Sequence, residues 1–354
     1  MNLDHLFDDK EGVLLVDLSQ IALATVMQTY EPGMKFTVPE VRHMILSTLK
    51  HNAFKFKTEG FNKVVICIDN ARYGYWRRQE QDYYKRNRAI AREESAETFD
   101  WDGYFEGLST TIQEMKDYMP YIVLDVKHAE ADDCIAVLAK YLTASGNFKV
   151  RIISSDGDFT QLHKFEDVDQ YSPMQKKFVK VKSKSPEMDC MVKILKGDRK
   201  DCVAAIKVRG NFWLNYEEGV ERTPPTATAY IENMVGKSDD EVYETIYDEV
   251  MKKVAHKKHG VTEALKLLSL QGIPKEDVES IIDDNAKLGK FIADAQFIRF
   301  KQNRVLIDFD YIRQDMVDAI LSEYKTFKPA PRGKMYGYFV KSGLSKLLKD
   351  INQF

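Results

Sequence analysis

Acidic residues recur where short apolar runs rich in β-branched residues end. Asp17 follows the apolar residues 13–16, Asp69 follows 64–68, and Asp156 follows a run that begins at 150. Each run has the composition of a buried β-strand. The carboxyl ends of parallel strands meet at one edge of a sheet, where ligands bind. Near such ends, or just after a helix, we find nine candidate carboxylates: Asp17, Asp69, Glu130, Asp132, Asp133, Asp156, Asp158, Asp198 and Asp201.

Carboxylates crowded at one edge repel one another unless their charge is compensated. A divalent cation is the obvious compensation, and a ligand set of oxygens alone indicates Mg²⁺ or Mn²⁺ rather than zinc. Each element also has a plainer reading, because an Asp after a strand is often a helix cap and Asp-Gly is common in turns. The combination of EADD (130–133), SSDGDFTQL (154–162) and GDRKD (197–201) favours a metal site.

The elements that position these residues alternate between strands and helices. Patterns typical of helices fall at 39–58, 76–96 and 102–119, between the strand-like runs. This alternation predicts an α/β domain built on a mostly parallel sheet. After about residue 186 the pattern becomes helical and polar. We therefore predict two domains, an α/β domain over 1–187 and a smaller, mainly helical domain over 188–354.

The composition excludes several classes of protein. Hydrophobic residues make up 44% of the 354 residues, enough for a core. No apolar run approaches the ~18 residues of a membrane helix, and the first residues lack the features of a secretory signal. The 4 cysteines are scattered, which favours small buried thiols over disulfides or a zinc site. We expect a cytoplasmic monomer without membrane contact.

The net charge is −3, from 52 basic and 55 acidic residues, yet two stretches are strongly basic. Over 72–92, aromatic residues alternate with Arg and Lys, a combination that can stack on unpaired bases and follow phosphates. The second stretch spans 176–209. The plainer readings are a solvated helix face and, for 175–184, an edge strand protected by lysines. The candidate nucleic-acid contacts are Arg77, Arg78, Tyr84, Lys85, Arg86, Arg88, Arg92, Lys176, Lys177, Lys180, Lys182, Lys196, Arg199, Lys200, Lys207 and Arg209.

Two of these cations have a spacing that suggests a more specific role. Lys85 and Arg92 are seven residues apart and would lie on one face of a continuous helix. That face could present both cations to one scissile phosphodiester.

The motifs as a set resemble the 5′-nuclease (flap endonuclease) superfamily. They are LxDxSQ (15–20), CIDNAxxGYWRR (67–78), YYKxNR (83–88), EADD, SSDGDFTQL and ILKGDxxD (194–201). The similarity is greatest to the branch of the T-even phage ribonucleases H. It covers roughly the first two hundred residues and returns at 305–312 and 331–347.

The resemblance implies a three-layer α/β nuclease domain with a helical arch over about 72–100. It also implies a helix–three-turn–helix element over about 190–213 that grips duplex DNA. All nine carboxylates match the family's ligands, for two Mg²⁺ ions that Mn²⁺ can replace. The first ion would be held by Asp17, Asp69, Glu130, Asp133 and Asp156, and the second by Asp158, Asp198 and Asp201. Lys85, Arg92 and Asp133 would be catalytic, and Tyr84 would stack on a base.

The implied activity is that of a metal-dependent 5′→3′ exonuclease and flap endonuclease with ribonuclease H activity. Such an enzyme would remove RNA primers and 5′ flaps during phage lagging-strand replication, in the cytoplasm of the infected bacterium. Its partners would be DNA and RNA–DNA hybrids with 5′ ends, flaps or forks, a sliding clamp and a single-stranded DNA-binding protein. Two alternatives remain open: a non-catalytic DNA-binding scaffold, and a phosphatase of the haloacid dehalogenase type. The latter usually has DxDx[TV] after the first strand, where this chain has DLS.

Three segments depart from the resemblance or extend it. The sequence DCVAAIKVRG (201–210) lacks the family's Gly-rich turn, which leaves its ion-assisted grip on DNA open. The segment 226–290 reads as an insertion. At the N-terminus, LDHLF (3–7) resembles the short peptides with which replication proteins dock into a sliding clamp, through Leu3, Leu6 and Phe7. The plainer reading is that residues 1–10 fold back onto the α/β domain.

Overall fold

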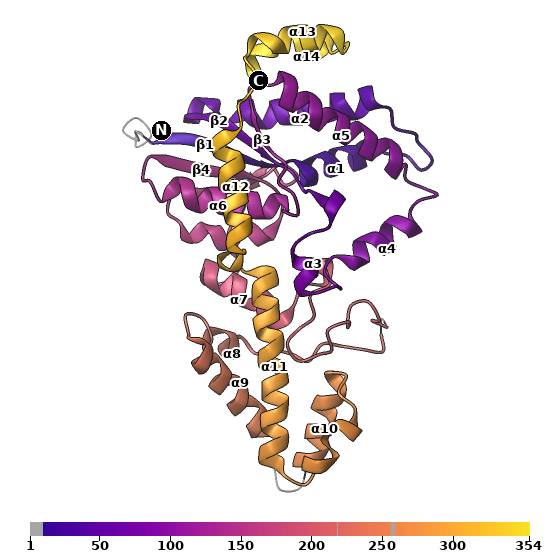
Figure 1. Ribbon diagram of the computed structural model, residues 1–354, viewed down its shortest axis with the longest axis vertical. Coiled ribbons are helices and arrows are strands. Elements are labelled where there is room, and N and C mark those ends of the chain that lie inside the picture. The colour runs from indigo at the N-terminus through magenta and orange to yellow at the C-terminus, as the bar shows by residue number, and fades with distance from the viewer. Residues whose placement is uncertain (1–9, 218, 256–258) are drawn as a thin grey trace. The chain divides into compact units, whose positions relative to one another are not determined.

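The computed structural model describes residues 10–217, 219–255 and 259–354 (Figure 1). The predicted clamp-binding residues Leu3, Leu6 and Phe7 lie outside the described residues.

The chain forms two compact units, and each is assembled from separate segments. The first unit contains the chain up to Trp76, Arg92–Val181 and Ile312–Phe354. The second contains Arg77–Ala91 and Lys182–Tyr311. The predicted division at residue 187 treats each domain as one continuous stretch, and it remains a prediction.

The first unit is built on a six-stranded sheet whose order is β3-β2-β1-β4-β5-β6. Neighbouring strands are parallel except β6, which pairs with β5 in the antiparallel direction at the edge. Val16 lies opposite Ile66 on one side and Ile153 on the other, so β1, β2 and β4 end at the same level. The strands are β1 (Glu11–Asp17), β2 (Phe61–Cys67), β3 (Ile122–Leu124), β4 (Phe148–Ile153), β5 (Val168–Ser172) and β6 (Lys177–Phe178).

Helices cover both faces of this sheet, because its central strand is apolar on both sides. Leu14 and Val16 of β1 pack into a core with helices on one face, while Val13 and Leu15, equally buried, face the opposite way. The first helical layer contains α1 (Leu18–Thr29), α2 (Val38–Lys55), α5 (Trp101–Tyr118), α13 (Gly333–Lys341) and α14 (Ser345–Leu348). The second contains α6 (Ala131–Thr143) and α12 (Gln314–Thr326).

The C-terminal helices are tied into the first layer by a polar contact. Glu114 of α5 accepts two hydrogen bonds from Arg42 of α2, at 2.6 and 2.7 Å. The same carboxylate accepts a hydrogen bond from the hydroxyl of Tyr338 in α13 at 2.9 Å. The last part of the chain is therefore an integral part of the α/β unit.

The second unit is mainly helical. In Figure 1 the long α11 runs through it, with α9 and α10 packed alongside. The buried amide of Asn303, on α11, donates to the carbonyls of Ile194 and Ala204 and so joins the N-terminal part of the unit to this helix. The helices are α3 (Arg77–Glu80), α7 (Pro186–Lys196), α8 (Thr228–Glu232), α9 (Asp239–Val254), α10 (Gly260–Leu270) and α11 (Asn285–Ile307). Helix α4 (Arg86–Glu94) passes from the second unit into the first.

The predicted three-layer, mostly parallel α/β architecture with a helical C-terminal part is confirmed. The helices expected at 39–58 and 102–119 are α2 and α5. Two local predictions are wrong. The segment 76–96 is not one helix, because α3 ends at Glu80 and α4 begins only at Arg86. The helix–three-turn–helix element expected over about 190–213 has no second helix within that range, because Cys202 adopts a left-handed backbone conformation and the chain continues through turns.

Short 3₁₀ turns complete the described structure. They are η2 (Lys57–Glu59), η3 (Ala71–Tyr73), η4 (Gly157–Lys164), η5 (Arg199–Asp201), η6 (Lys275–Ile281), η7 (Phe309–Tyr311) and η8 (Ile351–Gln353). Among the described helices, none has the length and apolar character needed to cross a membrane.

Candidate active site

Asp17 is a buried carboxylate at the end of the sheet, and its pKa is strongly raised. It closes β1, is 4% exposed, and accepts hydrogen bonds from the amide of Gln20 at 3.1 Å and the hydroxyl of Ser154 at 2.9 Å. Burial raises its pKa, and the nearby charges of Asp69 and Asp156 raise it further. The two hydrogen bonds offset only part of this, so the pKa of Asp17 rises from 3.8 to about 7. Negative charge at this edge is thus in excess.

Asp69 contacts the first turns of two helices, α1 and α6. It lies just beyond β2, its amide donates to Ser19 at 3.2 Å, and its carboxylate accepts from the amide of Ala131 at 2.8 Å. Ala131 is the first residue of α6, where backbone N–H groups have no partner within the helix. The helix N-terminus therefore holds Asp69 at the sheet edge.

The EADD motif forms the start of α6. Glu130 and Asp133 form a reciprocal capping box, and both are completely buried. Asp133 accepts hydrogen bonds from the amide of Glu130 and from the indole Nε1 of Trp76, each at 2.9 Å. Asp132 lies in the same first turn. Burial raises the pKa of the Cys67 thiol, and the charges of Asp17, Asp132 and Asp69 raise it further. These acids therefore surround the end of β2.

The loop after β4 supplies two further acids. Asp156 begins the turn η4 and accepts from the amide of Asp158 at 3.1 Å. The amide of Asp156 donates to Ser154, and its carbonyl accepts from Gln170 at 2.7 Å. Ser154 thus contacts both Asp17 and Asp156, and it is completely buried. Sequence reasoning missed Ser154 and Gln170, although a serine before the DGD turn is a signal for the first.

The first unit places seven of the nine predicted ligands at one end of its sheet. In the described part of the chain, no three acidic, histidine or cysteine side chains converge closely enough to hold an ion as they stand. The donor set nevertheless fits a divalent cation, because it offers only oxygens and carries uncompensated charge, which the raised pKa of Asp17 records.

The remaining two predicted ligands, Asp198 and Asp201, belong to the second unit. Asp198 caps η5 and accepts from the amide of Lys200 at 2.8 Å. Asp201 is 6% exposed, with the guanidinium of Arg88 at 2.5 Å and the ammonium of Lys85 at 4.0 Å. Burial would raise its pKa, but these two cations and Lys200 outweigh that effect and lower it to about 2.

The structure changes the interpretation of Lys85 and Arg92. Lys85 precedes α4, has a φ of 54°, and is buried beside Asp201, so the two residues do not share the face of one helix. Its amide also donates to the carbonyl of Asp201 at 2.9 Å. Arg92 belongs to the first unit and lies over the ring of Phe105, 5.9 Å from its centroid.

Four predicted nucleic-acid contacts are interior residues, and Lys85, described above, is one of them. Arg77 is 1% exposed and donates to the carbonyl of Leu306 at 3.0 Å. Tyr84 is 3% exposed, and Lys207 is 5% exposed with its amine 3.4 Å from the carbonyl of Pro225. These side chains lie in the interior of the described structure, and their contact with nucleic acid stays a prediction.

Most of the other basic candidates are accessible. Both Arg78 and Arg86 are exposed. The lysines of 176–182 are exposed too, in agreement with an edge strand at β6 that is protected by lysines. Arg199 lies over the rings of Trp213 and Tyr216, at 5.6 and 5.2 Å. The exposed candidates are Arg78, Arg86, Lys176, Lys177, Lys180, Lys182, Lys196, Arg199 and Lys200.

A parallel sheet with buried acids at its carboxyl edge, and a return of the C-terminus onto the same unit, define a nuclease of the 5′→3′ exonuclease class. The family model of the 5′-3′ exonuclease N-terminal resolvase-like domain matches residues 21–189. The model of the C-terminal part of T4 ribonuclease H matches 184–285 and 270–354. The chain is 46% identical to the ribonuclease H of Enterobacteria phage T4 over the whole length of both proteins. It belongs to this family of phage 5′-nucleases.

More distant relatives share parts of the chain or its fold. DNA polymerase I of Thermus thermophilus is 29% identical over 157 residues, which are 44% of this chain and 17% of the polymerase. A crystal structure of a phage T5 protein with metal ions has a TM-score of 0.51 at 14% identity, covering 90% of this chain and 99% of that one. A T5 flap endonuclease in complex with DNA and metal ions has a TM-score of 0.50 at 15% identity, covering 89% and 100%. These two structures show the common fold.

Proposed function

We propose that this protein is a Mg²⁺-dependent 5′→3′ exonuclease and flap endonuclease with ribonuclease H activity. Its task would be the removal of RNA primers and 5′ flaps during phage lagging-strand replication. The observation that carries the chemistry is the group of buried acids around Asp17, whose pKa of about 7 reflects burial and the repulsion of Asp69 and Asp156. A cation with ligands of oxygen relieves that repulsion.

The proposed ligands form two sets. In the first unit Asp17, Asp69, Glu130, Asp133 and Asp156 would hold one ion, some of them through water. The resemblance to the 5′-nuclease family assigns Asp158, Asp198 and Asp201 to a second ion, and Asp132 is available to either. When bound, such ions lower the pKa of water and neutralise charge on the phosphodiester. Mn²⁺ has the same ligand preference and would substitute.

The surrounding residues position the acids. Trp76 fixes one oxygen of Asp133, and Ser154 fixes Asp17 while also accepting from the amide of Asp156. Asp69 is oriented by the first N–H of α6. These donors orient the carboxylates before any ligand arrives, which is the preorganisation that phosphoryl transfer requires. Lys85 and Arg92 are proposed to stabilise negative charge on the reacting phosphate.

The proposal is tested on three substrates that carry a label at the 5′ end: a flap, a nicked duplex and an RNA–DNA hybrid. Wild-type protein with Mg²⁺ is expected to release short 5′-labelled products from all three, and Asp69→Asn to release none. The matched control is Asp167→Asn, because Asp167 pairs with Lys10 at 2.7 Å away from the ligand set. Binding without cleavage by wild-type protein would instead support a non-catalytic scaffold.

Partners in replication remain part of this proposal. DNA and RNA–DNA hybrids with 5′ ends are the substrates, and a sliding clamp and a single-stranded DNA-binding protein are the proposed protein partners. A clamp tethered through the N-terminal peptide would raise the local concentration of enzyme at the primer end. Deleting residues 2–9 should then abolish stimulation by the clamp while hydrolysis of naked substrate stays near normal.

A further inference from the structure

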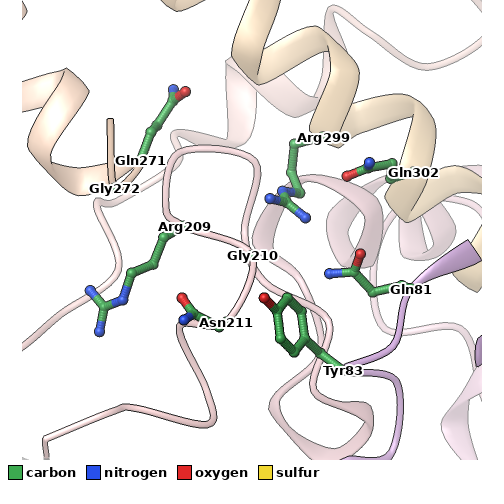
Figure 2. A pocket seen from close by; sticks show the side chains of 9 residues that line it. All are labelled: Gln81, Tyr83, Arg209, Gly210, Asn211, Gln271, Gly272, Arg299 and Gln302. Carbon is green, nitrogen blue, oxygen red and sulfur yellow. The ribbon is translucent and has the colours of Figure 1, made fainter. Parts of the chain in front are cut away.

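A polar pocket of about 390 Å³ lies within the second unit, apart from all the acids assigned to metal. Four segments far apart in the sequence form its wall, as Figure 2 shows. They are the turn after α3, the loop before Phe212, the end of α10 and one face of α11. The lining residues are Gln81, Tyr83, Arg209, Gly210, Asn211, Gln271, Gly272, Arg299 and Gln302, and none of them is acidic.

Arg299 provides the uncompensated charge of this pocket. Its side chain extends from α11 toward Gly210 (Figure 2), and it forms no ion pair and no side-chain hydrogen bond with any described residue. A Cβ placed on Gly210 would lie 2.6 Å from a guanidinium nitrogen, so the guanidinium rests directly on the glycine backbone. Burial lowers the pKa of Arg299 from its ordinary value, although arginine stays charged at neutral pH. Partial burial of a charge is unfavourable unless an opposite charge lies beside it, so an anion bound here would stabilise Arg299.

The other cation of the wall differs in this respect. Arg209 makes a two-pronged ion pair with Glu221, at 2.5 and 2.9 Å, and a further hydrogen bond to the carbonyl of Asn215. Its charge is therefore already compensated within the protein. Of the two arginines in the wall, Arg299 is therefore the one whose guanidinium can bind an anion from outside the protein.

Further donors line the same pocket. The buried side-chain Nε2 of Gln271 finds no acceptor among the described residues. The backbone amides of Gly210 and Asn211 also donate no hydrogen bond within the part of the chain that the structure describes. Tyr83 adds a hydroxyl and an aromatic face. Successive backbone N–H groups next to a guanidinium are a common arrangement for binding phosphate.

We propose that this pocket binds a phosphate group of a nucleotide, with Arg299 as the cationic contact and Gly210, Asn211 and Gln271 as neutral donors. Its volume exceeds that of a phosphate and leaves room for the attached sugar or base beside Tyr83. The ligand is either a phosphodiester of a bound strand or the phosphate of a free mononucleotide. The inference rests on the proposed function, because that function supplies the nucleic acid.

The test compares variants of the full-length protein. Arg299→Gln removes the charge, whereas Gly210→Ala keeps the charge but forces the guanidinium to move. Lys301→Gln is the matched control, because this substitution removes the same charge as Arg299→Gln. Lys301 is exposed on the same helix and does not line the pocket. Binding of a fluorescent flap duplex is measured by anisotropy in EDTA at several salt concentrations. Thermal shift with thymidine 5′-monophosphate reports the free nucleotide.

If the pocket holds a strand phosphate, Arg299→Gln and Gly210→Ala weaken duplex binding about 10-fold, and Arg299→Gln lowers the salt slope by about one counterion. If it holds a mononucleotide, both variants instead lose the thermal shift seen with wild-type protein. Arg299→Lys, which keeps the charge in a similar volume, decides the matter if Arg299→Gln does not fold, and is expected to retain partial binding.

The proposal is overturned if Arg299→Gln behaves like Lys301→Gln with both probes, or if Gly210→Ala behaves like wild type. Failure of the pocket and failure of the proposed function remain distinguishable. In the first case wild-type protein and Arg299→Gln cleave and bind the flap alike, and in the second wild-type protein with Mg²⁺ does not cleave it at all.

Discussion

The indole nitrogen of Trp76 donates a 2.9 Å hydrogen bond to the carboxylate of Asp133, and both side chains are almost completely shielded from solvent. The two residues are 57 positions apart in the sequence. Asp133 also caps the amide of Glu130, so one buried carboxylate joins the residue before α3 to the start of α6. A charged group in this environment depends on every donor it has.

Replacing Trp76 by Phe tests that dependence. Trp76→Phe preserves most of the apolar volume but removes the N–H donor, so we expect the free energy of unfolding to fall by about 2–3 kcal/mol and cleavage to drop. Chemical denaturation and the flap assay measure the two effects. The control is Trp101→Phe, whose indole donates to the hydroxyl of Ser95 at 3.0 Å in a less buried place. Equal effects of the two substitutions would argue that the hydrogen bond to the buried Asp133 is worth no more than one to a neutral hydroxyl.

Neutralising Asp133 should separate catalysis from binding. In Asp133→Asn the amide oxygen can still accept from Trp76 and Glu130, which preserves the fold, but the negative charge proposed to hold a metal is lost. We expect cleavage to be abolished while duplex binding, measured by anisotropy, stays within about 2-fold. Residual activity above a few per cent would remove Asp133 from the ligand set.

The raised pKa of Asp17 makes the metal-free protein sensitive to pH. Its pKa is 3.8 before folding perturbs it and about 7 in the folded state, so folding favours the protonated acid. This contribution is fully present below about pH 4 and is lost as the pH rises through 7, at ~1.4 kcal/mol for each pKa unit. We expect the melting temperature in EDTA to fall between pH 5 and pH 8. Added Mg²⁺ should restore it, and Asp17→Asn should flatten the profile.

Two cations of the predicted arch, Lys85 and Arg92, should affect the rate of cleavage. We expect Lys85→Ala and Arg92→Ala each to lower the single-turnover cleavage rate by about 100-fold, as for the loss of a group that stabilises the transition state. Lys35→Ala is the control, because Lys35 is a largely exposed lysine paired with Asp100. If either variant changes only the affinity for DNA, that residue contacts a distant phosphate.

The effect at Lys85 has a second, structural component. Lys85 and Arg88 together lower the pKa of Asp201, so removing one cation should raise that pKa and weaken the fold of the second unit. The double variant Lys85→Ala, Asp201→Asn relieves the unpaired charge. Because Asp201 is itself a proposed ligand, Asp201→Asn alone is the reference. A rate well below that of Asp201→Asn, after stability recovers, would assign Lys85 to catalysis.

Local pattern was sufficient wherever a residue's place depends on its own element. The apolar runs ending in Asp17, Asp69 and Asp156 predicted parallel strands and a carboxylate edge, because a buried strand is recognisable from its composition and the chain can only continue beyond its end. The acids of 130–133 lie at the start of a helix, where carboxylates can accept hydrogen bonds from N–H groups that have no partner within the helix.

Spacing failed where distant contacts override local preference. Lys85 and Arg92 have helical spacing, but the backbone of Lys85 is left-handed and its side chain is buried against Asp201, 116 residues later in the chain. Arg77 belongs to a basic stretch, yet its guanidinium donates to the carbonyl of Leu306, in the last turn of the long α11. Charge in a sequence shows that a cation exists, whereas its partner decides whether it faces solvent.

The sequence by itself determined the family, the α/β sheet and the acids at its edge, because these follow from composition, alternation and motifs within single elements. Only the tertiary structure decided which donors hold those acids and which cations remain available. Trp76 with Asp133, Ser154 with Asp17, and Arg299 on the backbone of Gly210 each join segments that the sequence leaves far apart. The physical reason is that hydrogen bonding and burial act through space, and packing of whole elements fixes those distances.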